Sequence, residues 1–379
     1  MKILFVCNSI YAKGNGLAVS ARATVDYLRR KGLDVKVLSM ENTEPGGPQP
    51  EFPLKPFYIP LFQKLIVNQG FAFASSDMKV LREAVEWADV IHLEEAFVLE
   101  WRVANLARKM GKPCVATFHL HPENILSSIA FGKVRWINDW LLRQFQRFVF
   151  DKCVAMQCPS KSVYDRLEKA GFKAKLYLIP NGISLEGDHH QGVPQTDPYL
   201  ITCVGRLSNE KDQYTLIRAM QYSRHRDNIQ LHFAGKGPCA KKMKKMAHKL
   251  YTGGVVKYDP IFAFHTAAEL TELARKAYLI VHCAIFEVEG LSLPEALREG
   301  AVPVIAECEL SATSQFALDE RSKFPAEDAK ALAEKIDWWI EHPEARAEMA
   351  PKYMASIDKY EIHKSMDMLE EMYKSVIAK

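Results

Sequence analysis

The sequence lacks the features of membrane-spanning, disulfide-rich and strongly charged proteins. No apolar run approaches the ~18 residues that a spanning helix needs, and the short apolar segment 1–7 predicts a buried strand rather than a signal peptide. None of the 8 cysteines forms a Cys-x-x-Cys pair, so we expect reduced thiols rather than a disulfide framework or a metal site. The formal net charge of only +4 gives no indication of a nucleic-acid partner.

Apolar runs alternate with helical patterns along the 379 residues, and the alternation starts twice. This spacing predicts parallel sheets covered by helices. We therefore expect an α/β protein of two Rossmann-like doubly wound domains facing across a cleft. The polar segment 187–198 marks the break between domains at 1–190 and 197–361. The six prolines of segment 45–60 predict a loop. The predicted strands are residues 2–6, 35–38, 88–93, 113–118, 199–204, 230–234, 279–282 and 302–305.

Open parallel sheets bind ligands at the carboxyl ends of their strands, and each candidate motif follows a predicted strand. Gly205, Arg206 and Lys211 follow the strand 199–204. A planar arginine fork and a lysine point charge at this place suit a diphosphate, while a solvated turn is the alternative on local chemistry alone. Gly235 belongs to a tight turn after the next strand, where a glycine permits close backbone approach.

A second group of polar residues follows the strand 279–282 and opens a helix. The expected helix N-terminus at 290–293 offers free backbone N–H groups to an anion. Glu287 lies on the preceding loop, from which it would converge with Glu295 on one ligand. The alternative for Ser292 and Glu295 is a capping box, in which the two residues satisfy each other's backbone N–H groups.

The N-terminal half contributes a strand-end histidine and a glycine loop. His119 ends the strand 113–118 on the side where the cleft is expected, which makes it a better functional candidate than most lone histidines. The loop 13–16, which includes Gly16, suits either a ligand contact or a plain turn. It lacks the third glycine of the dinucleotide fingerprint, so an NAD-dependent enzyme is not indicated.

Together these motifs resemble family 4 of the retaining glycosyltransferases, which have the GT-B fold. Gly-Arg-x-x-x-x-Lys at 205–211, Ala-Gly-x-Gly-Pro at 234–238 and Glu-x-x-Gly-Leu-Ser-Leu-x-Glu-Ala at 287–296 occur in the family's order. Val-x-Thr-Phe-His at 115–119 and Ile-Pro-Asn-Gly-Ile at 179–183 do so as well. The segment 119–125 is also loosely similar to bacterial diacylglycerol glycosyltransferases.

The resemblance implies roles for these residues. Arg206 and Lys211 would hold the donor's diphosphate, Glu295 the ribose, and Glu287 the donor sugar. His119 would lie near the reacting centre, and the helix 362–379 would complete the N-terminal domain. The implied catalytic residues are His119, Arg206, Lys211 and Glu287. The implied donor-binding residues are Gly16, Gly205, Arg206, Lys211, Gly235, Gly290, Leu291, Ser292 and Glu295. Basic groups replace a metal in this fold, so no metal and no cofactor are expected.

The segment 132–154 predicts a basic, aromatic, amphipathic helix. Its expected membrane or acceptor residues are Arg135, Trp136, Trp140, Arg143 and Arg147. Its apolar positions are Val134, Ile137, Leu141, Phe145 and Phe148. Such a helix can lie on an anionic membrane, and the apolar segment 57–74 would add to that surface. The alternative is that the apolar stripe packs on the sheet and the arginines are only solvated.

We therefore expect a metal-independent, retaining hexosyltransferase that uses a nucleotide-sugar, UDP-linked by preference. The expected acceptor is a lipid such as diacylglycerol, and the expected location is the cytoplasm, peripheral at the inner face of a bacterial membrane. One alternative is the same donor chemistry with a soluble saccharide or polysaccharide acceptor. Another is a non-catalytic nucleotide-sugar-binding module. No nucleic-acid partner is expected.

Overall fold

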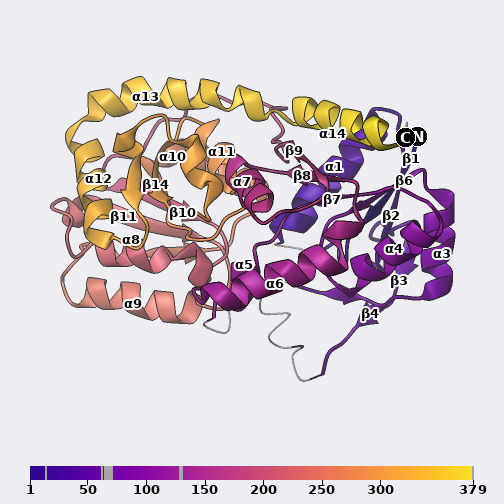
Figure 1. Cartoon of the computed structure of the whole chain (residues 1–379). Coiled ribbons are helices and arrows are strands. Elements are labelled where there is room, and N and C mark those ends of the chain that lie inside the picture. Colours follow the sequence, from indigo (N-terminus) through magenta and orange to yellow (C-terminus); the bar gives the residue numbers. More distant parts are fainter. Residues whose placement is uncertain (13–14, 61–62, 64–70, 128–130, 378–379) are drawn as a thin grey trace. The chain divides into compact units, whose positions relative to one another are not determined.

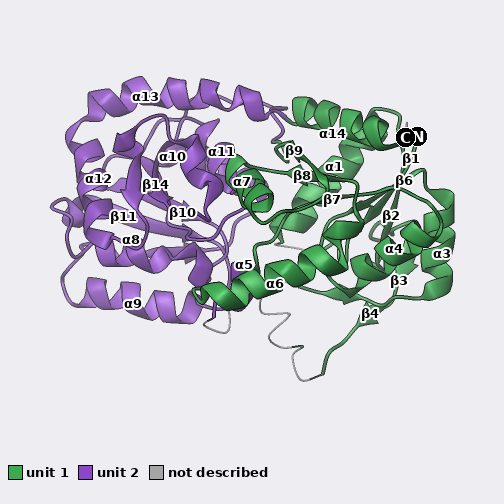
Figure 2. Cartoon of the chain, viewed as in Figure 1, with its two compact units in different colours: residues 1–122, 133–182, 362–379 green, residues 123–132, 183–361 purple. Residues whose placement is uncertain are grey.

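The chain forms two compact units in a computed structural model that describes residues 1–12, 15–60, 63, 71–127 and 131–377 (Figure 1, Figure 2). Unit 1 comprises Met1–Pro122, Lys133–Gly182 and Ile362–Lys379; unit 2 comprises Glu123–Gly132 and Ile183–Glu361. The division at 182/183 precedes the expected break at 187–198. The backbone of this segment bonds within unit 2, from Gly192 N–H to the Glu299 carbonyl and from Gln195 N–H to the Lys276 carbonyl.

Within the described residues, unit 1 is built on a seven-stranded parallel sheet of order β3-β2-β1-β6-β7-β8-β9. The strands are near-continuous apolar runs because helices cover both faces of such a sheet. The strand order reverses between β1 and β6, so the switch point lies there. The strands are β1 (Lys2–Val6), β2 (Asp34–Met40), β3 (Phe52–Leu54), β6 (Val90–Leu93), β7 (Cys114–Thr117), β8 (Ala155–Cys158) and β9 (Lys175–Leu178).

The C-terminal helix belongs to the core of unit 1. Met366 and Tyr373 of α14 (Ile362–Ile377) are fully buried beside Phe5 of β1 and Leu28 of α1 (Gly16–Arg30). The chain end is therefore part of the support of this sheet. The other helices around the sheet are α1 (Gly16–Arg30), α3 (Met78–Trp87), α4 (Val98–Lys109), α6 (Arg135–Phe148) and α7 (Lys161–Lys169), whereas α5 (Pro122–Leu126) belongs mostly to unit 2.

The expectation of a loop across 45–60 is wrong for part of that segment. It contains the edge strand β3 and also β4 (Pro56–Phe57), which pairs with β5 (Phe73–Ala74). Pro53 is tolerated in β3 because an edge strand has one side without a partner, where a missing N–H costs nothing. Much of the apolar segment 57–74 lies outside the described residues.

Unit 2 is a second doubly wound domain, with sheet order β12-β11-β10-β13-β14-β15 within the described residues. The order reverses between β10 and β13. The strands are β10 (Tyr199–Val204), β11 (Ile229–Ala234), β12 (Ile261–Ala263), β13 (Leu279–His282), β14 (Val302–Glu307) and β15 (Lys323–Pro325). The helices are α8 (Gln213–Ala219), α9 (Ala240–Thr252), α10 (Ala267–Lys276), α11 (Ser292–Leu297), α12 (Ala329–Glu341) and α13 (Pro343–Ser356).

Candidate functional site

The sequence-predicted residues of unit 2 lie at its topological switch point. Gly205 and Arg206 follow β10, and the loop with Glu287 and Gly290 follows β13, the strand on the other side of the reversal. The parallel register puts both loops at the carboxyl edge of the sheet. This is where doubly wound sheets bind ligands.

The loop after β10 is a built structure rather than a solvated turn. Arg206 Nη2 donates to Glu210 Oε1 at 2.6 Å, and the Ser208 hydroxyl donates to the same oxygen at 2.6 Å. Glu210 is buried, with 2% of its surface exposed, so its carboxylate acts as an internal anchor for the guanidinium. The alternative of an exposed turn is therefore wrong.

Lys211 and Glu287 form an ion pair across the switch point. Their side chains are 20% and 15% exposed, so both are partly shielded from water. Backbone hydrogen bonds to Leu310 and Ala312 hold Glu287 in place. Burial is the largest influence on Lys211, which Glu210 opposes, and it lowers the pKa of Lys211 to about 8.

His282, which the sequence analysis did not single out, lies beside this ion pair. Its Nε2 is 3.9 Å from Glu287 Oε2, and burial followed by the charge of Lys211 lowers the His282 pKa to about 3. Its Nδ1 is buried and has no hydrogen-bond partner among the residues that the structure describes. The available signal was its position as the last residue of a predicted strand.

Two glycines of unit 2 are required by close approach. A Cβ at Gly235 would lie 1.9 Å from the Gly205 carbonyl oxygen, so the turns after β10 and β11 touch through their backbones. Gly290 has φ of +79° and a Cβ there would meet Thr313 Cγ2 at 2.5 Å. Both glycines therefore shape the ends of the loops that carry Arg206 and Glu287.

The capping-box alternative for α11 is wrong. Leu291 is the N-cap, and Ser292 is already the first helical residue, with its hydroxyl 3.5 Å from the Val204 carbonyl oxygen. Glu295 is exposed. The Glu295 carboxylate is therefore not used in capping and is accessible from solvent.

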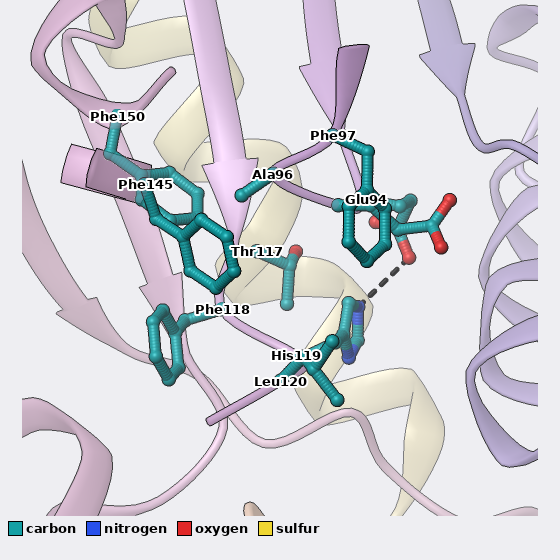
Figure 3. Close-up of a pocket in the computed structure, with 10 residues that line it drawn as sticks. Glu94, Ala96, Phe97, Thr117, Phe118, His119, Leu120, Phe145 and Phe150 are labelled. Atoms are coloured by element: carbon teal, nitrogen blue, oxygen red, sulfur yellow. Dashed lines mark ion pairs between the residues drawn. The ribbon is translucent and has the colours of Figure 1, made fainter. Parts of the chain in front are cut away.

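A pocket in unit 1 lies at the carboxyl ends of β6 and β7 (Figure 3). Phenylalanine rings form one part of it, and two carboxylates and an imidazole form the other. The pocket therefore has an apolar body and a polar end. Its lining residues are Glu94, Glu95, Ala96, Phe97, Thr117, Phe118, His119, Leu120, Phe145 and Phe150.

The polar end centres on Glu94, whose carboxylate lies between two imidazoles. Glu94 Oε2 is 2.8 Å from His119 Nε2, and Glu94 Oε1 is 3.0 Å from His92 Nε2. Burial opposes ionisation of Glu94, but both imidazoles favour it and outweigh burial, so the pKa of Glu94 is about 2. His119 is thus placed where it was expected, and its carboxylate partner was missed.

Asn8 joins the two strands that flank the switch point of unit 1. Its backbone N–H donates to Glu95 at 2.7 Å, and its side-chain amide donates to Glu95 and Glu100, both at 2.9 Å. Burial raises the pKa of both carboxyls, which lie close enough to disfavour a second charge. This network makes the floor of the polar end rigid.

Two further residues of unit 1 are Gly16, which was expected at the site, and His121, which was not. Gly16 is the first residue of α1, and a Cβ there would meet no atom of the described residues within 4 Å. The preceding Lys13 and Gly14 lie outside the described residues. His121 accepts a hydrogen bond from Arg166 Nη1 at 2.7 Å, and burial lowers its pKa, so it is a neutral structural histidine.

The helix α6 is amphipathic, but its buried face differs from the expected one. The buried positions are Asn138, Leu142 and Phe145, whereas Phe148 is 44% exposed. Trp136 and Trp140 are 72% and 53% exposed. At about 100° per residue, a narrow stripe of about 60° contains Trp136, Trp140, Arg143 and Arg147, all exposed.

Two searches of the described residues complete the inventory of the site. Within them, no three His, Cys, Asp or Glu side chains are grouped as metal ligands. No helix in that part of the chain has the length and apolar character needed to cross a membrane.

Comparisons with known proteins agree with this geometry. Residues 14–186 match the model of Glycosyltransferase Family 4, and residues 186–353 match that of Glycosyl transferases group 1. An alpha-monoglucosyldiacylglycerol synthase of Streptococcus pneumoniae is 24% identical over 81% of this chain and 71% of its own.

Two solved structures are also similar. The Anabaena protein HepE in complex with UDP-glucose is 16% identical, has a TM-score of 0.73, and the match covers 99% of this chain and 100% of that one. The catalytic domain of the cholesterol-alpha-glucosyltransferase of Helicobacter pylori is 43% identical over 43% of this chain and 100% of its own, with a TM-score of 0.39.

The two doubly wound units have the GT-B fold, as the similarity to the HepE structure shows, and the two matching family models identify a glycosyltransferase. The chain belongs to glycosyltransferase family 4.

Proposed function

We propose that the protein transfers a hexose, with retention and without a metal, from a UDP-sugar to the hydroxyl of a membrane lipid. On the donor side, Arg206 and Lys211 would neutralise the diphosphate as the glycosidic bond breaks and negative charge builds on the leaving group. Glu287 and Glu295 would bind hydroxyls of the sugar and the ribose. Gly16, Leu291 and Ser292 would offer free backbone N–H groups to the diphosphate.

The observation that carries the lipid acceptor is the exposed stripe of α6, in which Trp136 and Trp140 are 72% and 53% exposed beside Arg143 and Arg147. In unit 1, His119 and Glu94 lie at a pocket with room for about one water molecule, which suits a hydroxyl but no longer chain (Figure 3). The name of the Streptococcus pneumoniae relative, a glucosyldiacylglycerol synthase, supports the same acceptor class.

The protein would reach its acceptor by binding to an anionic bilayer through α6. The stripe of Trp136, Trp140, Arg143 and Arg147 combines interfacial aromatics with cations. The exposed Phe148 lies near Trp101 of α4, with ring centroids 6.2 Å apart, and extends this aromatic surface. The enzyme would then be a peripheral protein of the cytoplasmic membrane face.

The test is transfer of labelled sugar from UDP-glucose, UDP-galactose or GDP-mannose into lipid. Anionic vesicles would contain diacylglycerol, cholesterol or neither hydroxyl lipid, and a soluble saccharide would serve as a separate acceptor. Label in the organic phase that requires a hydroxyl lipid supports the proposal and identifies the sugar. Label only in the soluble saccharide would overturn the lipid acceptor, and donor binding without transfer to any acceptor would overturn the enzymatic function.

Removing two cations from α6 should weaken vesicle binding. Arg143→Gln with Arg147→Gln is expected to lower affinity for anionic vesicles about 30-fold, at roughly 1 kcal/mol per cation near the surface. Sedimentation with vesicles at low salt measures this. The matched control is Lys244→Gln with Lys245→Gln, which removes the same charge from exposed positions of α9 in unit 2. Equal losses in both variants would contradict a specific role of α6.

The rate should depend on the charge of Lys211. Because the pKa of Lys211 is lowered to about 8, the free enzyme loses this cation as the pH rises through that value. We expect kcat/KM for UDP-glucose to fall above about pH 8, since kcat/KM reports groups of the free enzyme. Lys211→Arg should remove this alkaline limb because arginine stays charged. A limb that persists unchanged in Lys211→Arg would assign it to another group.

A further inference from the structure

The side chain of His282 is a buried imidazole without a hydrogen bond in the part of the chain that the structure describes. It is 5% exposed. Its Nδ1 has no partner there, and its Nε2 lies 3.9 Å from Glu287 Oε2, which is too far for a hydrogen bond. A buried polar group with no hydrogen bond lowers stability, and such groups are rare in folded proteins. The fold therefore keeps, between the donor loops of unit 2, an imidazole whose hydrogen-bonding capacity is unmet.

Two side chains approach the same oxygen of Glu287. Lys211 forms its ion pair with Oε2, and His282 Nε2 faces that oxygen as well. The ammonium occupies this oxygen because its charge strengthens the hydrogen bond. His282 is neutral near physiological pH, since burial, followed by the charge of Lys211, lowers its pKa to about 3. The adjacent carboxylate favours the tautomer with the proton on Nε2, so this N–H points at an acceptor that Lys211 occupies.

Donor binding would change the partner of Lys211. In the proposed function Lys211 binds the donor's diphosphate, which carries more negative charge than the single carboxylate of Glu287. The diphosphate therefore competes for the ammonium, and the flexible lysine stem lets the ammonium move without its backbone. Glu287 would then lose its partner at the moment when its carboxylate must bind hydroxyls of the sugar.

Glu287 cannot follow the ammonium, because the loop that carries it is fixed. Its backbone N–H donates to the Leu310 carbonyl and its carbonyl accepts from the Ala312 N–H, both at 2.9 Å. His282 is fixed as well, since it is the last residue of β13 and pairs in register with Ile305 of β14. The carboxylate and the imidazole therefore stay neighbours when Lys211 moves away.

We propose that His282 is a positioning residue of the donor site: when the diphosphate draws Lys211 away, His282 Nε2–H takes its place at Glu287 Oε2 and holds the carboxylate toward the donor sugar. The inference rests on the proposed transferase function. A movement of about 1 Å brings the two atoms from 3.9 Å to hydrogen-bonding distance. The ring can turn by this amount without breaking a hydrogen bond, because Nδ1 makes none within the described residues.

The first test compares the affinity for a nucleoside diphosphate with the affinity for its sugar derivative. In His282→Leu the affinity for UDP-glucose should fall about 10-fold, the lower end of what a hydrogen bond to a charged group contributes. The affinity for UDP should fall by no more than about threefold, because water can hydrate Glu287 where the sugar is missing. Titration calorimetry without an acceptor measures both. An unchanged ratio of the two affinities would overturn the inference.

Three further variants test the contact with Glu287. His282→Gln places an amide N–H near the position of Nε2 and should restore most of the affinity for UDP-glucose, whereas His282→Asn reaches only as far as Nδ1 and should not. In Glu287→Ala, adding His282→Leu should change the affinity ratio less than about twofold, because the partner is already gone. The matched control is His232→Leu, which removes a buried histidine of the same sheet on β11 and should leave the ratio unchanged.

Thermal unfolding separates this role from a packing role. His282→Leu replaces a buried group that lacks hydrogen bonds by an apolar side chain, so its Tm should equal or exceed that of the wild type. A lower Tm together with equal losses of affinity for UDP and UDP-glucose would mean that His282 supports the fold, and would overturn the inference.

Nitrogen-15 spectra of the histidines give a readout that needs neither the sugar nor turnover. His282 should be protonated at Nε2 and unprotonated at Nδ1 before UDP is added. Saturation with UDP should move the Nε2 proton downfield as the hydrogen bond to Glu287 forms, and this movement should be absent in Glu287→Ala. A proton on Nδ1, or a signal that UDP leaves unchanged, would contradict the exchange of partners.

These outcomes separate the inference from the proposed function. UDP-galactose and GDP-mannose are titrated into the wild type as well, and the nucleotide-sugar that binds best is compared with its own nucleoside diphosphate in every variant. If the wild type binds and transfers the sugar while His282→Leu keeps the wild-type affinity ratio, only the role of His282 fails. If the wild type binds no nucleotide-sugar, the donor function fails and the inference fails with it.

Discussion

Arg206→Ala should lower kcat for sugar transfer about 1,000-fold, the upper range for removing one group that stabilises developing transition-state charge. The guanidinium lies at the switch point of unit 2 and is held by the buried Glu210 at 2.6 Å, so it is oriented before a ligand binds. Such an oriented cation needs little rearrangement as charge builds on the leaving diphosphate. Steady-state kinetics with saturating UDP-sugar measures the effect.

Two further arginine variants sharpen this expectation. Arg206→Lys keeps the charge but loses the planar fork, so its kcat should lie between those of Arg206→Ala and the wild type. Arg224→Ala removes an arginine of the same unit whose side chain is 69% exposed and pairs with Asp337 and Glu341, and it should change kcat less than twofold. If Arg206→Ala kept a tenth or more of wild-type kcat, the guanidinium would not be the main stabiliser.

The sheets could be predicted because their strands are buried on both faces. Residues 2–6, 199–204 and 279–282 are mostly apolar runs, and the structure has strands with these same bounds. The edge elements could not be predicted in the same way. Phe52–Leu54 pairs on one side only, and its sequence is dominated by the prolines that such an edge tolerates.

The candidate site likewise has residues that the sequence places and a residue whose contacts arise only in the fold. Arg206, Lys211 and Glu287 follow predicted strands, so their position could be inferred from chain order alone. Glu94 could not, because beside His92, two residues earlier on β6, it also contacts His119, which follows β7. Only the pairing of β6 with β7 creates that contact.

The helical spacing of the apolar residues predicted the helix α6 but not which of its faces is buried. Both the expected stripe and the observed one repeat at helical intervals, and the choice between them depends on what the sheet offers. Phe145 packs near Phe97, with ring centroids 6.4 Å apart, and this turns Trp136 and Trp140 outward. The physical reason for the exposed tryptophans is therefore a tertiary contact, which lies beyond the local pattern.

Gly235→Ala should lower kcat/KM for the donor 100-fold or more without removing any side chain that binds it. The new Cβ would lie 1.9 Å from the Gly205 carbonyl oxygen, a backbone atom that cannot rotate away. The two turns are also joined by the Leu207 N–H to Lys236 carbonyl bond at 2.9 Å, so they must separate together. Arg206 moves with its turn, and a displacement of about 1 Å in a group that positions the substrate lowers the reaction rate ~100-fold.

The variant must be compared with one that suffers the same clash elsewhere in unit 2. Gly192→Ala would put its Cβ 2.2 Å from the Arg275 carbonyl oxygen, again against backbone. The free energy of unfolding of both variants should fall by about 2 kcal/mol, a common cost of overpacking. Thermal unfolding measures this loss. Only Gly235→Ala should raise KM for the UDP-sugar and lower kcat. Equal kinetic losses in the two would mean that global destabilisation, rather than the position of Arg206, limits the reaction.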